Sequence, residues 1–165
     1  MTDTATSNDT SVTTSIEVDA PAERAFTVFT DGIESWWNPD HHIIEAPLAG
    51  MVFEPLVGGR IYDKGTDGSV CAWARVLAYE PPSRLVFSWD ISLHWQIETD
   101  PARCSEVEVR FIPQGPDRTR VELEHRHLDR HGAGWESMRS AVSAADGWGS
   151  GLARFAAVLG AGTVG

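Results

Sequence analysis

The feature that most constrains the fold of this chain is a long amphipathic stretch near its end. Apolar residues recur there at every third or fourth position, at Trp135, Met138, Val142, Ala145, Trp148, Leu152, Phe155 and Leu159. This spacing is that of a helix with 3.6 residues per turn and one apolar face. We therefore predict a single C-terminal helix from Trp135 to Leu159. Because a glycine inside a helix costs about 1 kcal/mol relative to alanine, we expect a kink or a loosened turn at Gly147, Gly149 and Gly151.

Strands with one apolar face supply the partner for this helix. Large apolar side chains alternate with polar ones in three segments, which place Leu85, Phe87, Trp89 and Ile91, then Val107, Val109 and Phe111, and finally Val121, Leu123, His125 and His127 on one face. Alternation of this kind predicts half-buried antiparallel strands. Since a helix and a sheet bury their apolar faces against each other, we expect the helix to lie on the concave face of a twisted sheet.

The first part of the chain predicts a tail, one strand and two short helices. Residues Met1 to Ser11 are polar and predict a disordered tail, so that a single domain is expected over residues 12–165. A strand is predicted from Val12 to Asp19, then a helix that opens at Pro21, then a second short helix from Ile33 to Trp37. With the later segments, the chain is expected to contain about seven strands.

Composition excludes several classes of protein. At 165 residues and 42% hydrophobic content, the chain can bury a core without disulfides or a structural metal. A net charge of −11 disfavours nucleic acid, which needs clustered basic residues. No apolar run approaches the ~20 residues that span a bilayer, so no membrane insertion is expected. Cys71 and Cys104 lack a CxxC spacing and the N-terminus lacks an export signal, which together predict a cytoplasmic location.

A set of short motifs resembles a known superfamily. The motifs are Ile16-Glu-Val-Asp-Ala-Pro21, Ala25-Phe26, Trp36-Trp37, Gly58-Gly59, Val76-Leu-Ala-Tyr-Glu-Pro-Pro82, Leu85-Val-Phe-Ser-Trp89, Glu124-His-Arg126 and Gly147-Trp148. In this order they resemble the SRPBCC or START-like superfamily, and within it the bacterial branch similar to the activator of heat-shock protein 90 ATPase (AHSA-like). The resemblance implies an α+β helix-grip fold, as in the birch pollen allergen: a curved antiparallel sheet around a long C-terminal helix, with two short helices between strands one and two.

The resemblance also implies a hollow between the sheet and the C-terminal helix. The candidate ligand-binding residues face it by strand parity or helix face, with the first two at its mouth: Trp36, Trp37, Phe87, Trp89, Phe111, Leu123, His125, Trp148, Leu152 and Phe155. Aromatic side chains at such positions are equally typical of a solid core. Both interpretations stay open at this point.

Histidines give the first candidate for acid–base chemistry, with a carboxylate in the hollow as the alternative. His125 and His127 alternate on the last predicted strand, and His131, His41 or His42 could join them. Two imidazoles on one face can ligate zinc, but there is no cysteine pair and no HExxH motif, so neither a metal nor a cofactor is predicted. His125 is the candidate catalytic residue, as a proton donor or acceptor in the hollow; the alternative is an interior histidine with all its hydrogen bonds made.

Charged residues near the predicted strand ends are interpreted as surface groups. Glu54, Arg60, Asp90 and Arg126 are the charged residues that could lie at the hollow, but alternation turns Asp90 and Arg126 away from the apolar face. A solvated position is therefore expected for all four.

Three functions are consistent with these features. The favoured one is a soluble protein that binds a hydrophobic, lipid-like or aromatic small molecule in the hollow. The second is an enzyme of the polyketide cyclase/dehydratase or hydrolase type that uses the same hollow. The third is a co-chaperone-like module with a chaperone or regulatory protein as partner. Trp95, in a polar connection, could contact a second subunit, so that a homodimer also stays open.

Overall fold

The computed structural model describes residues 10–37, 46–144 and 147–164. The strands are β1 (Val12–Val18), β2 (Leu48–Phe53), β3 (Arg60–Gly65), β4 (Val70–Glu80), β5 (Arg84–Trp89), β6 (Ser105–Gly115) and β7 (Arg118–Arg126). The helices are α2 (Ala22–Thr30), α3 (Ile33–Trp36), α4 (Trp135–Ser143) and α5 (Trp148–Val164), with short 3-10 turns η1 (Pro101–Arg103) and η2 (Leu128–His131). The predictions for residues 1–9 and for His41 and His42 lie outside the described residues.

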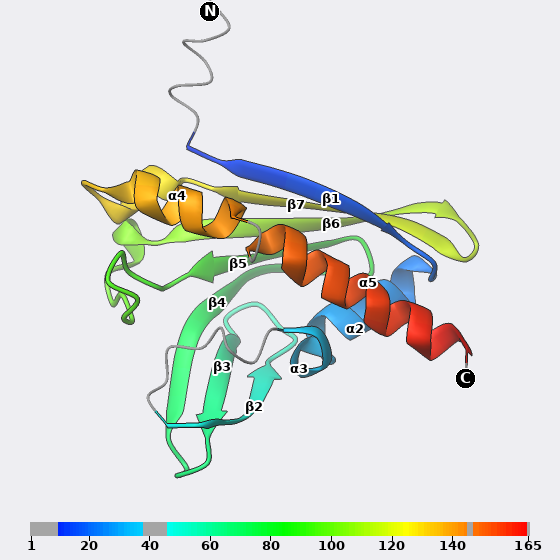
Figure 1. Cartoon of the computed structure of the whole chain (residues 1–165), viewed down its shortest axis with the longest axis horizontal. Helices are drawn as coiled ribbons and strands as arrows, with labels where there is room; N and C mark the ends of the chain where they lie inside the picture. Colours follow the sequence, from blue (N-terminus) through cyan, green and yellow to red (C-terminus); the bar gives the residue numbers. More distant parts are fainter. Residues whose placement is uncertain (1–9, 38–45, 145–146, 165) are drawn as a thin grey trace, which may run out of the picture.

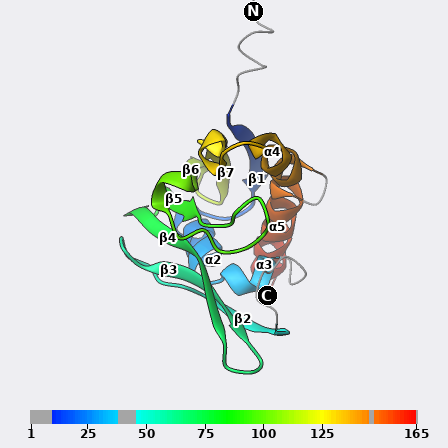
Figure 2. The same cartoon turned by 90° about the vertical axis from the view of Figure 1, so that its left-hand side faces the viewer.

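All seven strands form one antiparallel sheet with the order β1-β7-β6-β5-β4-β3-β2. The sheet curves around α5, and α2 and α3 lie on the same inner side (Figure 2). The hairpins of β2, β3 and β4 extend away from the rest of the sheet (Figure 1). The predicted helix-grip fold, with seven strands and two short helices between the first two, is confirmed.

The alternating pattern of the central strands builds the core. Val107, Val109 and Phe111 of β6 are buried, and their neighbours on β7, Val121 and Leu123, are fully buried beside them. Val109 lies directly opposite Leu123 and Phe111 directly opposite Val121, so both strands present their apolar side chains to the helices. No helix in the described part of the chain is long and apolar enough to cross a membrane.

The C-terminal helix differs from the prediction, because the chain forms two helices there. The backbone of Ala144 is extended, with ψ at 170°, so α4 stops at Ser143 and α5 starts at Trp148. Gly147 permits this arrangement, since a Cβ atom on it would lie 2.2 Å from the carbonyl oxygen of Val142. The apolar stripe survives the break, with these members buried: Met138, Val142, Trp148, Leu152, Phe155 and Leu159.

One charged residue lies elsewhere than predicted. Asp90 is buried, and both of its carboxylate oxygens accept hydrogen bonds of 3.0 Å from the guanidinium of Arg75. The solvated position expected for Asp90 is therefore wrong, because Arg75 on the neighbouring strand covers it. Arg126 does lie on the outer face of the sheet, where it pairs with Glu106 and Glu108.

Candidate functional site

The aromatic side chains on the inner face form two groups, which meet where Trp36 and Trp37 lie 5.5 Å apart between ring centroids. The first fills the space between α2, α3, the sheet and the middle of α5, and its members are Phe26, Phe29, Trp36, Phe111 and Phe155. Ring centroids in this cluster are 4.7 to 5.7 Å apart. Trp36 lies deep in it, with the indole Nε1 3.4 Å from the carbonyl oxygen of Phe29, and so does not lie at a mouth. This part of the interior is solid core.

The second cluster is a closed ring of four tryptophans, which we call the indole ring. Trp37 lies 5.0 Å from Trp73 between ring centroids. Trp73 lies 5.7 Å from Trp89, and Trp89 lies 5.6 Å from Trp148. A distance of 5.8 Å between Trp148 and Trp37 closes the ring, and Phe87 packs against it from the sheet.

The indole ring joins every layer of the fold. Trp37 follows α3, Trp73 belongs to β4, Trp89 ends β5 and Trp148 begins α5. The indole Nε1 of Trp73 donates a hydrogen bond of 3.1 Å to the buried carboxylate of Asp63, which fixes its position. Trp37 is the half-buried member, while the other three are buried. Trp37 is therefore the member of the indole ring with the most exposed surface.

His125 lies directly behind the indole ring. Its imidazole centroid is 5.1 Å from that of Trp89, and the residue is completely buried. Nδ1 of His125 is 3.1 Å from the indole Nε1 of Trp148, and Nε2 is 2.7 Å from Oγ of Ser105. Burial, and secondarily the nearby His131, lower the pKa of His125 to about 3. The imidazole is therefore neutral at neutral pH.

The histidine that joins His125 is His131, and not His127 as its alternation suggested. Strand β7 ends at Arg126, and His127 adopts a left-handed backbone with φ at 60°, so its side chain leaves the face of the strand. The turn η2 then brings His131 back, and its Nε2 lies 2.7 Å from Oγ of Ser105. One serine hydroxyl thus bridges two buried imidazoles.

Two buried side-chain nitrogen atoms at this site have no hydrogen-bond partner among the residues that the structure describes. They are Nε1 of Trp89, which can only donate, and Nδ1 of His131. Trp89 is only 6% exposed, so water does not readily replace the missing acceptor. A buried donor without a partner costs about 1–3 kcal/mol, which favours a bound molecule that carries an acceptor oxygen.

The predicted site residues divide between these surroundings. The indole ring and its neighbours contain Trp37, Phe87, Trp89, His125 and Trp148, whereas Trp36, Phe111 and Phe155 belong to the solid cluster. Leu123 and Leu152 are buried between sheet and helix. A ligand contact for any of them stays a prediction.

Two members of the site, Trp73 and Ser105, are not predicted by the sequence, and His131 is predicted only as one of three histidines that could join His125. Both faces of the strand that carries Trp73 are apolar, so alternation could not assign its direction. Nothing in the sequence marks Ser105. His131 was noted only as a reinforcement of His125, since the turn that returns it to the core has no clear signal.

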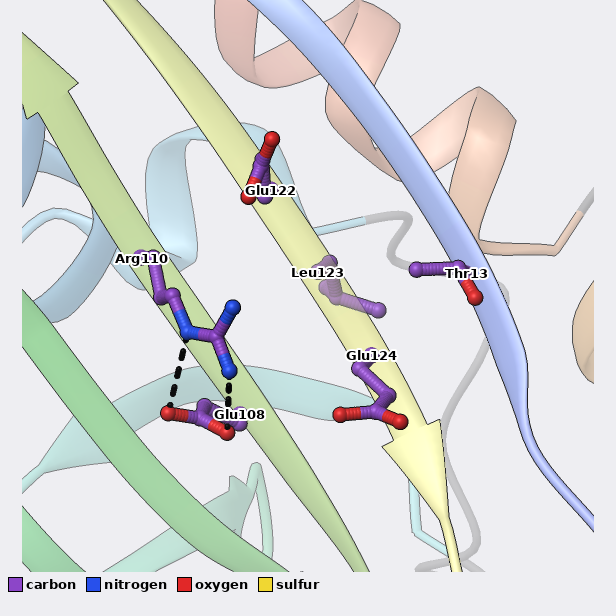
Figure 3. A pocket seen from close by; sticks show the side chains of 6 residues that line it. All are labelled: Thr13, Glu108, Arg110, Glu122, Leu123 and Glu124. Carbon is purple, nitrogen blue, oxygen red and sulfur yellow. Dashed lines mark hydrogen bonds and ion pairs between the residues drawn. The ribbon is translucent and has the colours of Figure 1, made fainter.

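A separate hollow of about 240 Å³ lies on the outer face of the sheet, across β1, β7 and β6 (Figure 3). It is lined mainly by charged side chains, among them Glu108, Arg110 and Glu124. Burial raises the pKa of Glu108, but hydrogen bonds from Arg84, Arg110 and Arg126 outweigh it and lower the pKa to about 2. Its charge is thus already neutralised within the protein, and the hollow does not suit an apolar ligand.

Neither metal ligands nor a reactive thiol were found in the parts of the chain that the structure describes. No group of three or more His, Cys, Asp or Glu side chains there could hold a metal ion. Burial raises the pKa of the Cys104 thiol to about 12, so this cysteine stays protonated.

Comparison with known proteins places these features in a family. The family of activator of Hsp90 ATPase homolog 1-like proteins matches residues 19–160. The chain matches none of the curated proteins. Among solved structures it is similar to "an anthrahydroquino-Gama-pyrone synthase", Txn09, complexed with SUM: 44% identity, 90% of this chain and 96% of the other covered, and a TM-score of 0.65.

Two further structures extend the comparison. The self-sacrificing resistance protein CalC from Micromonospora echinospora is 28% identical, with 92% of this chain and 94% of the other covered and a TM-score of 0.63. An HSP90 activator from Plasmodium falciparum, PFC0360w, is 20% identical, with 81% and 88% covered and a TM-score of 0.52, and shares the fold alone. Since the match spans nearly the whole domain, the chain belongs to the activator of Hsp90 ATPase homolog 1-like family.

Proposed function

We propose that this protein binds a flat polycyclic aromatic molecule at the indole ring and catalyses the closure of a ring in it. The observation that carries the proposal is the juxtaposition of four indoles with one neutral, fully buried histidine. Fold and family support a hydrophobic ligand-binding or cyclase-like role in general.

The indole ring supports an aromatic ligand in particular. Indoles offer large, rigid faces on which flat rings stack, and they do so at little cost in conformational entropy. In the structure the four indoles touch one another, so a ligand enters by parting them, beginning with the half-buried Trp37. Nε1 of Trp89 then donates its hydrogen bond to an oxygen of the ligand. An apolar site with one or two directed polar groups is typical of small-molecule pockets.

The synthase comparison supports the type of ligand and reaction. That protein is 44% identical over 90% of this chain, and its name describes a product with a γ-pyrone ring on an anthrahydroquinone. A γ-pyrone closes when a phenol oxygen attacks the far carbonyl carbon of a neighbouring β-diketone and a water molecule leaves. Such a substrate is flat, polycyclic and rich in acceptor oxygens, which matches the indole ring and the N–H of Trp89, for which the described residues supply no acceptor.

His125 is the residue suited to the proton transfers of this closure. The phenol must lose a proton when its oxygen attacks, and the departing hydroxyl must gain one. A neutral imidazole can do the first and, once protonated, the second. Trp89 Nε1 would hold the attacked carbonyl oxygen while it gains negative charge.

Two measurements test the proposal. Native mass spectrometry of protein purified from its own host should show one bound aromatic molecule per chain, which is released on denaturation. An anthrahydroquinone with a phenol beside a β-diketone, incubated with the protein without oxygen, should lose one water in mass, and His125→Asn should slow this loss by about 10²-fold or more. An equal rate with and without wild-type protein contradicts the enzyme assignment.

A second candidate function is sequestration of the same kind of molecule without turnover. It is favoured by the hydrogen bond from Trp148, which occupies the one lone pair of His125 that faces the indole ring. Stoichiometric binding without loss of water is its expected signature. The predicted chaperone partner stays a prediction, since the neighbour named as an HSP90 activator is only 20% identical.

A further inference from the structure

We infer that His125, Ser105 and His131 form a proton relay, and that the indole of Trp148 keeps its entrance closed until a ligand displaces it. This inference rests on the proposed function for the identity of the ligand. It assigns two residues, Ser105 and His131, that act behind the binding site rather than in it. The hydrogen-bonded chain itself is a property of the protein alone.

The position of each proton on His125 follows from its partners. An indole N–H can only donate, so Nδ1 of His125, 3.1 Å from Nε1 of Trp148, must be the acceptor. A neutral imidazole with an accepting Nδ1 carries its proton on Nε2. That N–H therefore donates to Oγ of Ser105 at 2.7 Å.

The next hydrogen bond, from Ser105 to His131, has the same direction. The oxygen of Ser105 accepts from His125, so its single hydroxyl proton is available to Nε2 of His131 at 2.7 Å. His131 in turn carries its own proton on Nδ1, the buried N–H that has no acceptor among the described residues. All hydrogen bonds thus run one way, from Trp148 through His125 and Ser105 to His131.

Such a chain can carry a proton once the first donor is removed. When the indole of Trp148 moves away, a phenol of the ligand can give its proton to Nδ1 of His125. The Nε2 proton of His125 moves to Oγ of Ser105, and the hydroxyl proton of Ser105 moves to Nε2 of His131. The ligand becomes a phenolate and His131 an imidazolium, with only N–H and O–H bonds exchanged and nothing oxidised or reduced.

The charges around the two histidines favour His131 as the end of the relay. His125 is fully buried, and the only charged or titratable neighbour that shifts its pKa is His131, which disfavours a cation there. Burial lowers the pKa of His131 as well, but the carboxylate of Glu98 raises it, against a smaller lowering by Arg103. Glu98 therefore gives the arriving positive charge a counter-charge that His125 lacks.

The indole of Trp148, which closes the entrance of the relay, is also part of the proposed binding site. Trp148 belongs to the indole ring and also covers Nδ1 of His125. A ligand that parts the indoles therefore uncovers the lone pair at the same time. The relay is closed in the empty protein and opens only when a substrate is in place.

Nitrogen-15 NMR of the histidine rings, recorded on the full-length protein without ligand, tests this series of hydrogen bonds. At neutral pH we expect a single tautomer for each residue, with the proton on Nε2 of His125 and on Nδ1 of His131. Trp148→Phe removes the fixed donor, so both rings should then show mixed tautomers. Trp73→Phe is the matched control from the same indole ring, because Trp73 donates to Asp63, and it should leave both tautomers unchanged. A proton on Nδ1 of His125 in the wild-type protein would overturn the inference.

A second measurement tests proton transfer with alizarin, a hydroxyanthraquinone whose visible absorbance reports the ionisation of its phenol. Bound to the wild-type protein, alizarin should be ionised at a lower pH than when it is bound to Ser105→Ala or His131→Phe, by about one pH unit, a tenfold effect. Ser105→Thr, which keeps the hydroxyl, should restore the shift. Equal ionisation in all four proteins contradicts the relay. Should alizarin not bind at all, the proposed ligand class is wrong, while the tautomers measured by NMR still decide whether the chain exists.

Discussion

The indole N–H of Trp148 donates a hydrogen bond of 3.1 Å to Nδ1 of His125, and this contact connects the aromatic site with the buried histidine pair behind it. His125 approaches from the last strand of the sheet, and Trp148 is the first residue of α5. The pair therefore joins the two layers of the fold at the point where the indole ring closes. Any movement of α5 against the sheet therefore changes both the space for a ligand and the accessibility of the lone pair on Nδ1 of His125.

Trp37 controls access to the indole ring, and its truncation should weaken binding. Trp37→Ala removes two of the four ring contacts, those with Trp73 and Trp148. We expect the affinity for alizarin to fall about tenfold, since aromatic pairs contribute about 0.5–1.5 kcal/mol beyond the buried area. Fluorescence quenching during titration measures it. Trp95→Ala is the control, because Trp95 is 49% exposed on a loop, and an equal loss in both variants would contradict a site at the indole ring.

His125 should make the protein less stable in mild acid. The pKa of His125 is lowered to about 3 in the folded protein from an ordinary 6.5. Below pH 6.5 the imidazole of His125 is protonated in the unfolded state but stays neutral in the folded state. The free energy of unfolding should therefore decrease as the pH is lowered, by up to about 1.4 kcal/mol per pH unit. This loss continues until the pH approaches 3.

Urea unfolding between pH 7 and pH 4.5 measures this slope. His125→Asn cannot titrate, so its stability should depend less steeply on pH over the same range, whatever its stability at pH 7. His94→Asn is the matched control on an exposed loop and should keep the wild-type slope. Identical slopes for wild type and His125→Asn would show that the histidine is not a buried neutral group.

The acidic network on the outer face makes a separate prediction at lower pH. The three arginines that bond Glu108 keep its pKa at about 2, below its usual 4.5, against the effect of burial. The ionised Glu108 therefore stabilises the folded protein fully above pH 4.5, and this stabilisation is lost as the pH falls towards 2. Glu108→Gln should cost about 1–3 kcal/mol at pH 7 and should flatten the pH dependence in that window. The control is Glu122→Gln, which removes one ion pair with Arg120 at the surface and should change neither the free energy of unfolding at pH 7 nor its pH dependence. Urea unfolding of the two variants and the wild type from pH 5 downwards measures the difference.

The fold could be predicted because its signals are periodic. Alternation fixed the inner faces of β6 and β7, where Val109 and Leu123 lie opposite each other, and spacing by three and four fixed the stripe of α5. The kink or loosened turn expected at the glycines lies at Gly147, but the sequence did not predict that α4 and α5 are two separate helices, since the apolar stripe continues through the break without a change of phase. Glycines marked the weak region, but only the close approach of Gly147 to Val142 shows that the chain turns there.

The site could be predicted only in part, because its members meet through irregular backbone. Phe87, Trp89 and His125 follow from strand parity. His131 does not, since its position depends on the left-handed backbone of His127 and the turn after it. Strand parity also does not predict the face on which Trp73 lies, since β4 has register shifts against both neighbouring strands. The burial of Asp90 under Arg75 does not follow from the sequence, because alternation gives the face of a residue but not what covers it.

The junction between α4 and α5 yields the last prediction, from two glycines that lie two positions apart. A methyl group on Gly147 would lie 2.2 Å from the carbonyl oxygen of Val142, a backbone atom that cannot turn aside. Gly147→Ala should therefore shift the start of α5 and cost about 2–4 kcal/mol in the free energy of unfolding. Gly149 has open space around its Cα and lies exposed within α5, so Gly149→Ala should instead stabilise the protein by up to about 1 kcal/mol. Since Trp148 lies between them, Gly147→Ala should also disturb the hydrogen bond to His125, which the histidine tautomers seen by NMR would report. Equal stability of the two variants would mean that the helices do not meet at Gly147.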